Sequence, residues 1–127
     1  MYRYVISYEP YNFKGWLHDY PDTVAYGSKM DALRTEYREY LWDGEFRDKC
    51  GAKVVTLAGQ AHHPYSRFEA GNGASALIIC NYEDVPTCVT AELESGKLTQ
   101  YRTVDENIWH PAAGGINIPA RSAVLVL

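Results

Sequence analysis

The chain ends in the sequence "GGINIPARSAVLVL", residues 114–127, and this stretch decides the fold class. Two isoleucines alternate with other residues, a proline follows, and a second apolar run continues to Leu127. Alternating and continuous apolar runs separated by turn residues are typical of β-strands. Since an apolar strand must be covered, we expect residues 122–127 to lie inside a sheet with a second sheet facing it.

The sequence before this stretch repeats the pattern of short apolar runs and turns. "ASALIICNY" (residues 74–82) is nearly continuously apolar, which is typical of a central strand, and "TCVTAEL" (residues 87–93) alternates. This spacing predicts a mainly-β chain, an antiparallel β-sandwich over residues 51–127 without a second long helix. Strands are expected at 53–58, 66–70, 74–82, 87–93, 98–104, 115–119 and 122–127, with Leu77, Ile79, Val89, Leu93, Ile118, Val124 and Val126 facing inward.

Residues 1–50 have a different pattern and contain one helical segment. "SKMDALRTEYREYLWDG" (residues 28–44) predicts a helix over residues 29–43, capped by Ser28 with Asp31 and ended by a left-handed Gly44. Its apolar face, with Leu33, Tyr37 and Leu41, should be buried. Before it we expect a strand over residues 2–8 and a long loop over residues 11–27.

The composition excludes several classes of protein. The net charge is −4 and no basic block is present, so nucleic acid is not an expected partner. No apolar stretch is long enough to span a membrane. The N-terminus lacks the pattern of a signal peptide, so we expect a cytoplasmic protein. We expect no cofactor.

The three cysteines, Cys50, Cys80 and Cys88, show no metal-binding spacing. Cys80 and Cys88 flank a turn, so a disulfide across a hairpin is one interpretation. The other is that all three are small buried residues in a chain that does not rely on disulfides.

The order of elements resembles a known family. "LRTEYREYLWDGEFRD" (residues 33–48), "ALIICNYED" (76–84) and "INIPARSAVLVL" (116–127) are similar to the C-terminal region of glycoside hydrolases with a (β/α)8 catalytic barrel and an appended β-sandwich. The resemblance implies that residues 1–50 correspond to the last barrel unit and residues 51–127 to the sandwich. The expected function is that of a non-catalytic accessory region that stabilises or shapes a catalytic domain, with that domain or a carbohydrate as partner.

Glu9 is the one candidate for a catalytic group. It follows the predicted strand 2–8, and barrel enzymes place catalytic residues at such strand ends. Glycoside hydrolysis requires two carboxylates, and the sequence indicates no second one. A small hydrolase that uses Glu9 therefore stays an alternative, and a solvated residue at a strand end is the other interpretation.

Aromatic residues crowd the expected loop and indicate a possible sugar-stacking platform. A free-standing carbohydrate-binding module would use them because flat rings stack on the apolar faces of sugars. The competing interpretation is that they pack into the junction between the two halves. The candidates are Tyr8, Tyr11, Trp16 and Tyr20, with Phe13 beside them.

Two further polar segments are expected to be ordinary loops. His62 and His63 would point to opposite faces of a strand, and no other ligand lies at a suitable spacing, so no metal site is predicted. The other segment contains Asp105, Glu106, Trp109 and His110, and the alternative interpretation is that it forms the rim of a ligand site.

The strand predicted over residues 2–8 has no partner in the sequence pattern. An unpaired apolar edge favours association, so we expect a symmetric homodimer through this strand. Its contact would include Tyr2, Tyr4 and Ile6 and the aromatic residues of the 11–20 segment.

Overall fold

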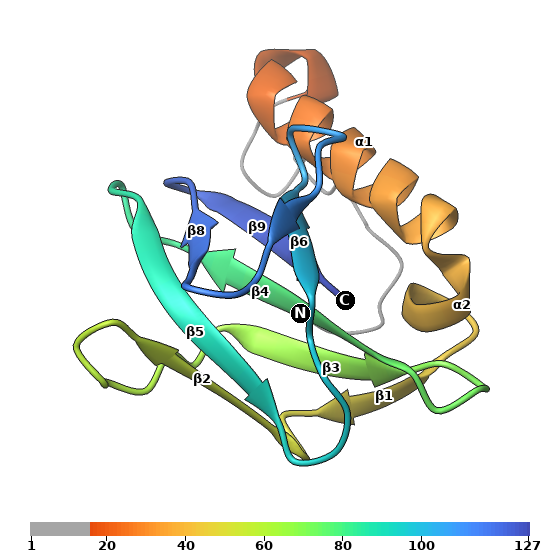
Figure 1. The fold of residues 1–127 in the computed structure, drawn as a ribbon. Coiled ribbons are helices and arrows are strands. Elements are labelled where there is room, and N and C mark those ends of the chain that lie inside the picture. Colours follow the sequence, from red (N-terminus) through yellow and green to blue (C-terminus); the bar gives the residue numbers. More distant parts are fainter. Residues whose placement is uncertain (1–15) are drawn as a thin grey trace.

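The computed structural model describes residues 16–127, in which helices are followed by strands (Figure 1). The prediction of a mainly-β chain with antiparallel sheets is confirmed, and no long helix interrupts residues 53–127. The elements are the 3-10 helix η2 (Leu17–Asp19), α1 (Pro21–Glu36), α2 (Arg38–Leu41), β1 (Glu45–Asp48), β2 (Ala52–Thr56), β3 (Tyr65–Glu69), β4 (Ser75–Asn81), β5 (Thr87–Leu93), β6 (Gln100–Thr103), β7 (His110–Pro111), β8 (Ile116–Ile118) and β9 (Ser122–Val126).

The strands form two antiparallel sheets. One has six strands in the order β1-β3-β4-β9-β6-β7, and the other has three in the order β2-β5-β8. The C-terminal strand β9 lies between β4 and β6, so that Val126 is opposite both Leu77 and Tyr101. Both hydrogen-bonding edges of β9 are therefore paired, as its apolar sequence predicts.

The two sheets share one hydrophobic core. Leu77, Ile79, Val124 and Val126 from the six-stranded sheet cluster with residues of β2, β5 and β8 from the other sheet. Six of the seven residues expected to face inward are fully buried, and the seventh, Leu93, is half-buried against the same cluster. The alternation of apolar residues was thus sufficient to place the core-facing side chains.

A second core lies on the opposite face of the six-stranded sheet, which α1 and α2 cover (Figure 1). Met30, Leu33 and Leu41 pack there against the alternate residues of the strands, including Ile78 and Leu125. The six-stranded sheet is thus the middle of three layers, and this explains why β4 and β9 are apolar on both faces. The expectation that a facing sheet covers β9 describes one face only.

Buried Arg102 on β6 joins the helices to the sheet. Its Nη1 donates to the Glu36 carboxylate at 3.1 Å and to the Asn107 side-chain oxygen at 2.6 Å. The Tyr37 hydroxyl lies 3.3 Å from the same nitrogen. A buried guanidinium needs such partners, so this cluster has a structural role between the layers.

The helix differs from its predicted form. α1 begins at Pro21, a residue favoured in the first helical turn, and the side chain of Tyr20 makes no cap. Ser28 lies inside the helix, so the predicted capping box is wrong, as is the loop expected to reach residue 27. The helix ends at Glu36 because Tyr37 leaves helical geometry, with φ −105° and ψ 44°. Helical geometry resumes in α2. Leu33 and Leu41 are buried as predicted, whereas Tyr37 is half-buried.

Gly44 is required for a reason other than the predicted left-handed conformation. Its φ is not positive. A Cβ on this residue would lie 2.9 Å from the carbonyl oxygens of Glu39 and Glu69 and still closer to that of Tyr40. The helical segment and β3 therefore approach the backbone closely at the point where the chain turns into β1.

The predicted strands are present, with ends that shift by a residue or two. β6 is shorter than expected, and β1 and β7 were not expected from the sequence. β1 pairs with β3 and so joins the six-stranded sheet, and the predicted domain boundary at residue 50 falls in the turn between β1 and β2. The strand predicted over residues 2–8 lies outside the described residues.

Candidate functional site

The end of the molecule at which α1 begins is held together by the carboxylate of Asp105. This residue follows β6 and accepts hydrogen bonds from Lys29 Nζ on α1 at 2.7 Å and from Ser122 Oγ on β9 at 3.0 Å. The bond from Lys29 is the main reason that the pKa of this carboxyl lies below its usual value, although partial burial opposes it. Three segments that are distant in sequence are thus fixed to one another.

We expect Asp105→Asn to destabilise the protein at pH 7 and to have little effect in acid. A carboxyl whose pKa is lowered by folding contributes stability above its unfolded pKa, about 3.9, and loses it as the pH falls through the folded value. Urea unfolding at pH 7 and near pH 3 measures the difference. Asp31→Asn, at an exposed position on α1, is the control, and a pH-independent difference for Asp105→Asn would contradict this role of the ion pair.

The loop between β4 and β5 is also fixed. The buried Asn81 side chain donates to the carbonyl oxygens of Val85 at 2.8 Å and Pro119 at 3.1 Å. The backbone N–H of Arg121 donates to Glu83 O at 3.0 Å, and the Arg121 guanidinium pairs with Asp84. The hydrogen bond from the Arg121 guanidinium lowers the pKa of the Asp84 carboxyl. The β4–β5 and β8–β9 loops therefore form one unit.

Large apolar side chains are exposed on the segment that leads into α1 and on the loops after β4 and β6. Trp16 is 73% exposed and Tyr82 is 70% exposed, and Tyr20, Val85 and Ile108 also lie open to solvent. We call this group, Trp16, Tyr20, Tyr82, Val85 and Ile108, the apolar end. Leu57, the other exposed large apolar residue among those described, lies in the loop after β2, away from α1 (Figure 1).

Two hollows adjoin Tyr82. The smaller, of about 220 Å³, is lined by Tyr26, Asn81, Tyr82, Arg121 and Ser122. Burial is the main cause that raises the pKa of Tyr26 to about 12, so its hydroxyl stays protonated at neutral pH. The larger hollow has a volume of about 520 Å³ and mixed polar and aromatic walls, formed by Asp48, Lys49, His63, Pro64, Tyr65, Ser66, Tyr82 and Glu83.

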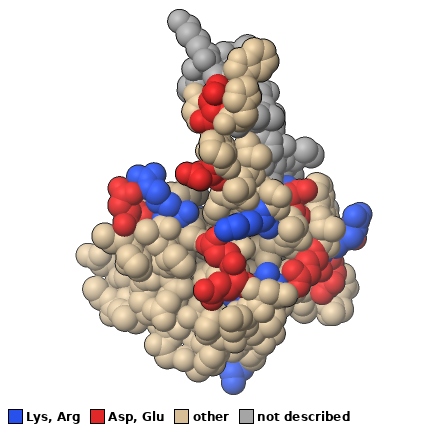
Figure 2. Space-filling model, turned by 90° about the horizontal axis from the view of Figure 1, so that it is seen from above, with Lys and Arg blue, Asp and Glu red and all other residues tan. Residues whose placement is uncertain are grey.

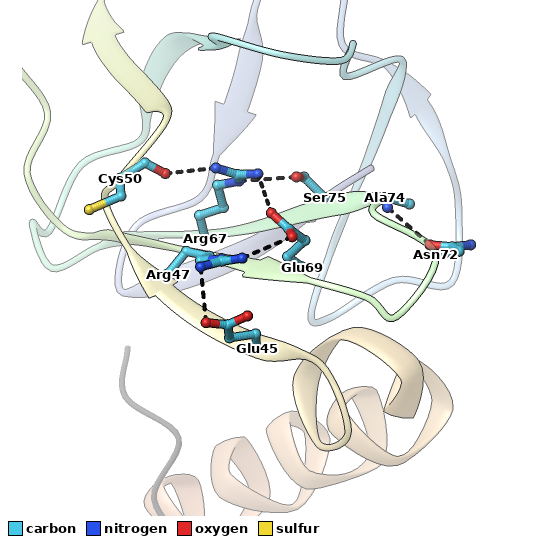
Figure 3. Close-up of polar contacts among 8 residues, drawn as sticks. All are labelled: Glu45, Arg47, Cys50, Arg67, Glu69, Asn72, Ala74 and Ser75. Carbon is cyan, nitrogen blue, oxygen red and sulfur yellow. Dashed lines mark hydrogen bonds and ion pairs between the residues drawn. The ribbon is translucent and has the colours of Figure 1, made fainter.

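The turn after β1 forms one wall of the larger hollow, and Arg67 holds it (Figure 3). Arg67 donates from Nη1 to Cys50 O at 2.9 Å, from Nε to Ser75 Oγ at 3.0 Å and from Nη2 to Glu69 at 2.7 Å. Glu69 also accepts from Arg47 at 3.1 Å. Arg67 on β3 thus holds the turn that follows Asp48 and Lys49.

The predicted site residues are only partly covered by the described chain. Glu9, Tyr8, Tyr11 and Phe13 lie outside it. Trp16 and Tyr20 are exposed at the apolar end, and neither lines one of the two hollows.

The polar loops have structural contacts. His62 bonds to Cys80 O at 2.8 Å through its Nε2, whereas His63 is exposed on the wall of the larger hollow. Trp109 packs edge-on against Tyr37, with ring centroids 5.8 Å apart, and His110 lies in β7 rather than in a loop. Within residues 16–127, no group of three or more His, Cys, Asp and Glu side chains is placed to hold a metal ion.

All three cysteines are free thiols. Cys80 lies in the six-stranded sheet and Cys88 in the other, so the hairpin disulfide is wrong because β4 and β5 do not pair. Cys80 is buried as expected, and burial raises the pKa of its thiol. The expectation that all three cysteines are buried is wrong for Cys50, which is exposed in the turn after β1, and Cys88 is only half-buried.

Tyr82 and Asp48 were not expected as site residues, and His63 was considered only as a metal ligand. A signal for Tyr82 was present: it follows the most apolar strand and begins the turn "YED", where a large ring has no core to enter. No comparable signal marks Asp48, the last residue of β1, and the position of His63 on the wall of the hollow depends on the tertiary structure.

No helix in residues 16–127 is long and apolar enough to cross a membrane. Comparisons of the chain with protein-family models, with curated proteins and with solved structures found no match.

Proposed function

We propose that this chain is a non-catalytic accessory region of a carbohydrate-active enzyme, which docks on a (β/α)8 catalytic domain and stabilises it. The resemblance of residues 33–48, 76–84 and 116–127 to glycoside hydrolase C-terminal regions supports the proposal. The observation that carries it is the apolar end, where the segment that leads into α1 and the loops after β4 and β6 expose large apolar side chains.

Exposed apolar surface is typical of interaction sites. The segments that present Tyr82, Val85 and Ile108 are held by the hydrogen bonds of Asn81 and Asp105, so the surface is formed before any partner arrives. A preformed surface loses little conformational entropy on binding, which favours docking.

The position of α1 agrees with a catalytic domain docked on the apolar end. The helix begins at the apolar end, directly after Trp16 and Tyr20. The resemblance assigns residues 1–50 to the last unit of a barrel, so the start of α1 would face the docked domain.

The surface charge favours a protein partner over nucleic acid. On the face drawn in Figure 2, Lys and Arg lie among Asp and Glu in small mixed groups with uncharged surface around them. The net charge of the chain is −4. Nucleic-acid binders instead concentrate basic side chains on one face.

The homodimer through residues 2–8 stays a separate prediction, because that strand lies outside the described residues. It shares Trp16 and Tyr20 with the proposed docking surface. A dimer would therefore compete with the catalytic domain for the apolar end.

The test starts from the genomic DNA upstream of the codon for Met1. The proposal expects a fused or neighbouring reading frame that encodes a (β/α)8 barrel. When the barrel is co-expressed with this chain, we expect the two to elute together and the barrel to melt at a higher temperature. Trp16→Ser and Ile108→Ser should each weaken the complex by about tenfold, since central apolar contacts dominate interfaces.

Leu57→Ser is the matched control, because Leu57 is exposed and apolar but lies outside the apolar end. It should leave the complex unchanged. An upstream frame of another class, a barrel that elutes separately, or equal losses in the Leu57 and Trp16 variants would each overturn the proposal.

A further inference from the structure

We propose that Asn72 is a site of spontaneous covalent modification, at which the side-chain amide is converted to a carboxylate through a cyclic imide. The site lies at the tip of the β3–β4 hairpin, in the sequence "GNG" (residues 71–73). The reaction needs only water and involves neither the apolar end nor the two hollows. It therefore does not depend on the docking of a catalytic domain.

The turn itself requires a glycine at position 73. Gly73 has a φ of 83°, in the left-handed region that residues with a side chain rarely adopt. Its N–H donates to Ala70 O at 2.9 Å and so closes the turn. The fold therefore places after Asn72 the one residue type whose backbone nitrogen is not shielded by a side chain.

The site is open to water. Asn72 and Gly73 are exposed, and a Cβ on Gly73 would meet no other atom within 4 Å. Solvent base can therefore reach the Gly73 nitrogen once its hydrogen bond to Ala70 is broken, and a small leaving group can diffuse away.

The reaction joins two groups that are neighbours along the chain. After solvent base removes the proton of the Gly73 N–H, the nitrogen attacks Asn72 Cγ and a C–N bond forms. The bond from Cγ to Nδ2 then breaks, and Nδ2 takes up a proton and leaves as ammonia. Water opens the resulting imide either at Cγ, which gives aspartate, or at the main-chain carbonyl, which gives isoaspartate. Overall, one water is consumed and one ammonia released, without oxidation or reduction.

The amide of Asn72 is held in a position that favours this attack. Its Oδ1 accepts a hydrogen bond from Ala74 N at 2.9 Å (Figure 3). Because Ala74 follows Gly73, this bond folds the side chain back along the Gly73 backbone. The same bond stabilises the negative charge that develops on Oδ1 as the nitrogen attacks.

The hydrogen bond of the nucleophile limits the rate in the native protein. The Gly73 N–H is bonded to Ala70 O, and the Ala70 N–H donates to Ala74 O at 2.8 Å. The reaction therefore requires local opening of the turn, which is easier at an exposed hairpin tip than within the strands. Since one or two hydrogen bonds are broken, we expect the native rate to be about 10- to 100-fold below that of the unfolded chain.

The two products differ in their effect on the hairpin. Aspartate keeps a side-chain oxygen that can accept from Ala74 N. Isoaspartate adds a methylene group to the main chain, close to Ser75, whose hydroxyl accepts a hydrogen bond from Arg67 Nε at 3.0 Å (Figure 3). Both products add one negative charge, so that the net charge changes from −4 to −5.

The experiment is incubation of the full chain at pH 8, both native and unfolded in guanidinium chloride, followed by anion-exchange chromatography and peptide mass spectrometry. Asn107 and Asn117 are internal controls, because both are exposed but each is followed by isoleucine. We expect Asn72 to be modified faster than either control in both states, with isoaspartate among the products. The native rate should be the lower one, by about 10- to 100-fold.

Two variants separate the chemistry from the charge. Asn72→Gln keeps an amide but would have to form a larger ring, so modification at this position should be lost. Asn72→Asp carries the charge of the product without the additional methylene group, and it should melt at the temperature of the unmodified chain. The purified isoaspartate form should melt at a lower temperature.

Three results would each overturn the inference. The first is that Asn72 in the native chain is modified no faster than Asn107 and Asn117. The second is that its rates in the native and unfolded chains are equal. The third is that the isoaspartate form melts at the same temperature as Asn72→Asp. None of these results bears on co-elution with a barrel, so the two proposals are tested separately.

Discussion

Replacing Gly44 with alanine is expected to destabilise the protein by about 3 kcal/mol. The added Cβ would lie 2.9 Å from Glu39 O and from Glu69 O and closer still to Tyr40 O. All three atoms belong to backbone, so no side chain can rotate to make room. Relief requires the helical segment and β3 to move apart.

The position of Gly44 in the fold makes this separation costly. Gly44 is buried between α2 and β1, next to the pairing of Phe46 with Phe68. Phe68 and Leu41 belong to the core between the helices and the six-stranded sheet. A shift of the backbone at Gly44 would therefore disturb that core as well as the β1–β3 pairing.

Denaturant unfolding followed by circular dichroism measures the effect. Gly71→Ala is the matched control, because its φ is not positive and a Cβ there would meet no atom within 4 Å. We expect the control to change the free energy of unfolding by less than about 0.5 kcal/mol. Equal losses in both variants would show that close approach is not the reason for a glycine at position 44.

Leu33→Ala is expected to cost about 2–5 kcal/mol, the usual range for truncating a buried leucine. Leu33 is 2% exposed and packs from α1 onto the six-stranded sheet. The truncation would leave a cavity between two rigid layers that cannot collapse fully. Leu41→Ala on α2 is expected to fall in the same range, because Leu41 belongs to the same core.

The same substitution at an exposed site shows the effect of removing a leucine side chain that is not buried. Leu57 is 67% exposed in the loop after β2, so Leu57→Ala should be nearly neutral. Thermal melts of the three variants provide the comparison. A melting temperature that stays unchanged in Leu33→Ala and Leu41→Ala would show that the helices are not part of the core.

The strands and their inward faces were predictable because their signal is local. A side chain in a strand points to the opposite face from its neighbour, so apolar alternation places Val89 and Ile118 in the core without knowledge of their partners. The unbroken apolar runs of β4 and β9 likewise predicted central strands. The pairing order, with β9 between β4 and β6, is not encoded in any one strand.

The start of α1 was missed because its first turns carry little apolar pattern. Residues 21–25 are exposed or half-buried, so no periodic face marks them as helical. β1 was missed for a related reason: in "EFRD" it is the edge strand of the sheet, with exposed ends and a bulge in its pairing with β3. Weakly buried segments leave weak sequence signals.

The candidate site depended on contacts between distant segments. Asp48, His63 and Tyr82 lie far apart in the sequence and meet only because β1, β3 and β4 are neighbours in one sheet. The apolar end likewise combines the start of α1 with two loops that Asp105 and Asn81 hold.

The sequence by itself determined the mainly-β class, the inward residues of the strands and the burial of Leu33 and Leu41. Those features depend on the periodicity of apolar residues within a single segment. This periodicity is a property of the segment's sequence and does not depend on where the segment packs. The tertiary structure alone decided the strand order, the need for Gly44 and the walls of the hollow. Those features depend on distances between segments, and such distances exist only after the two sheets and the helices have packed together.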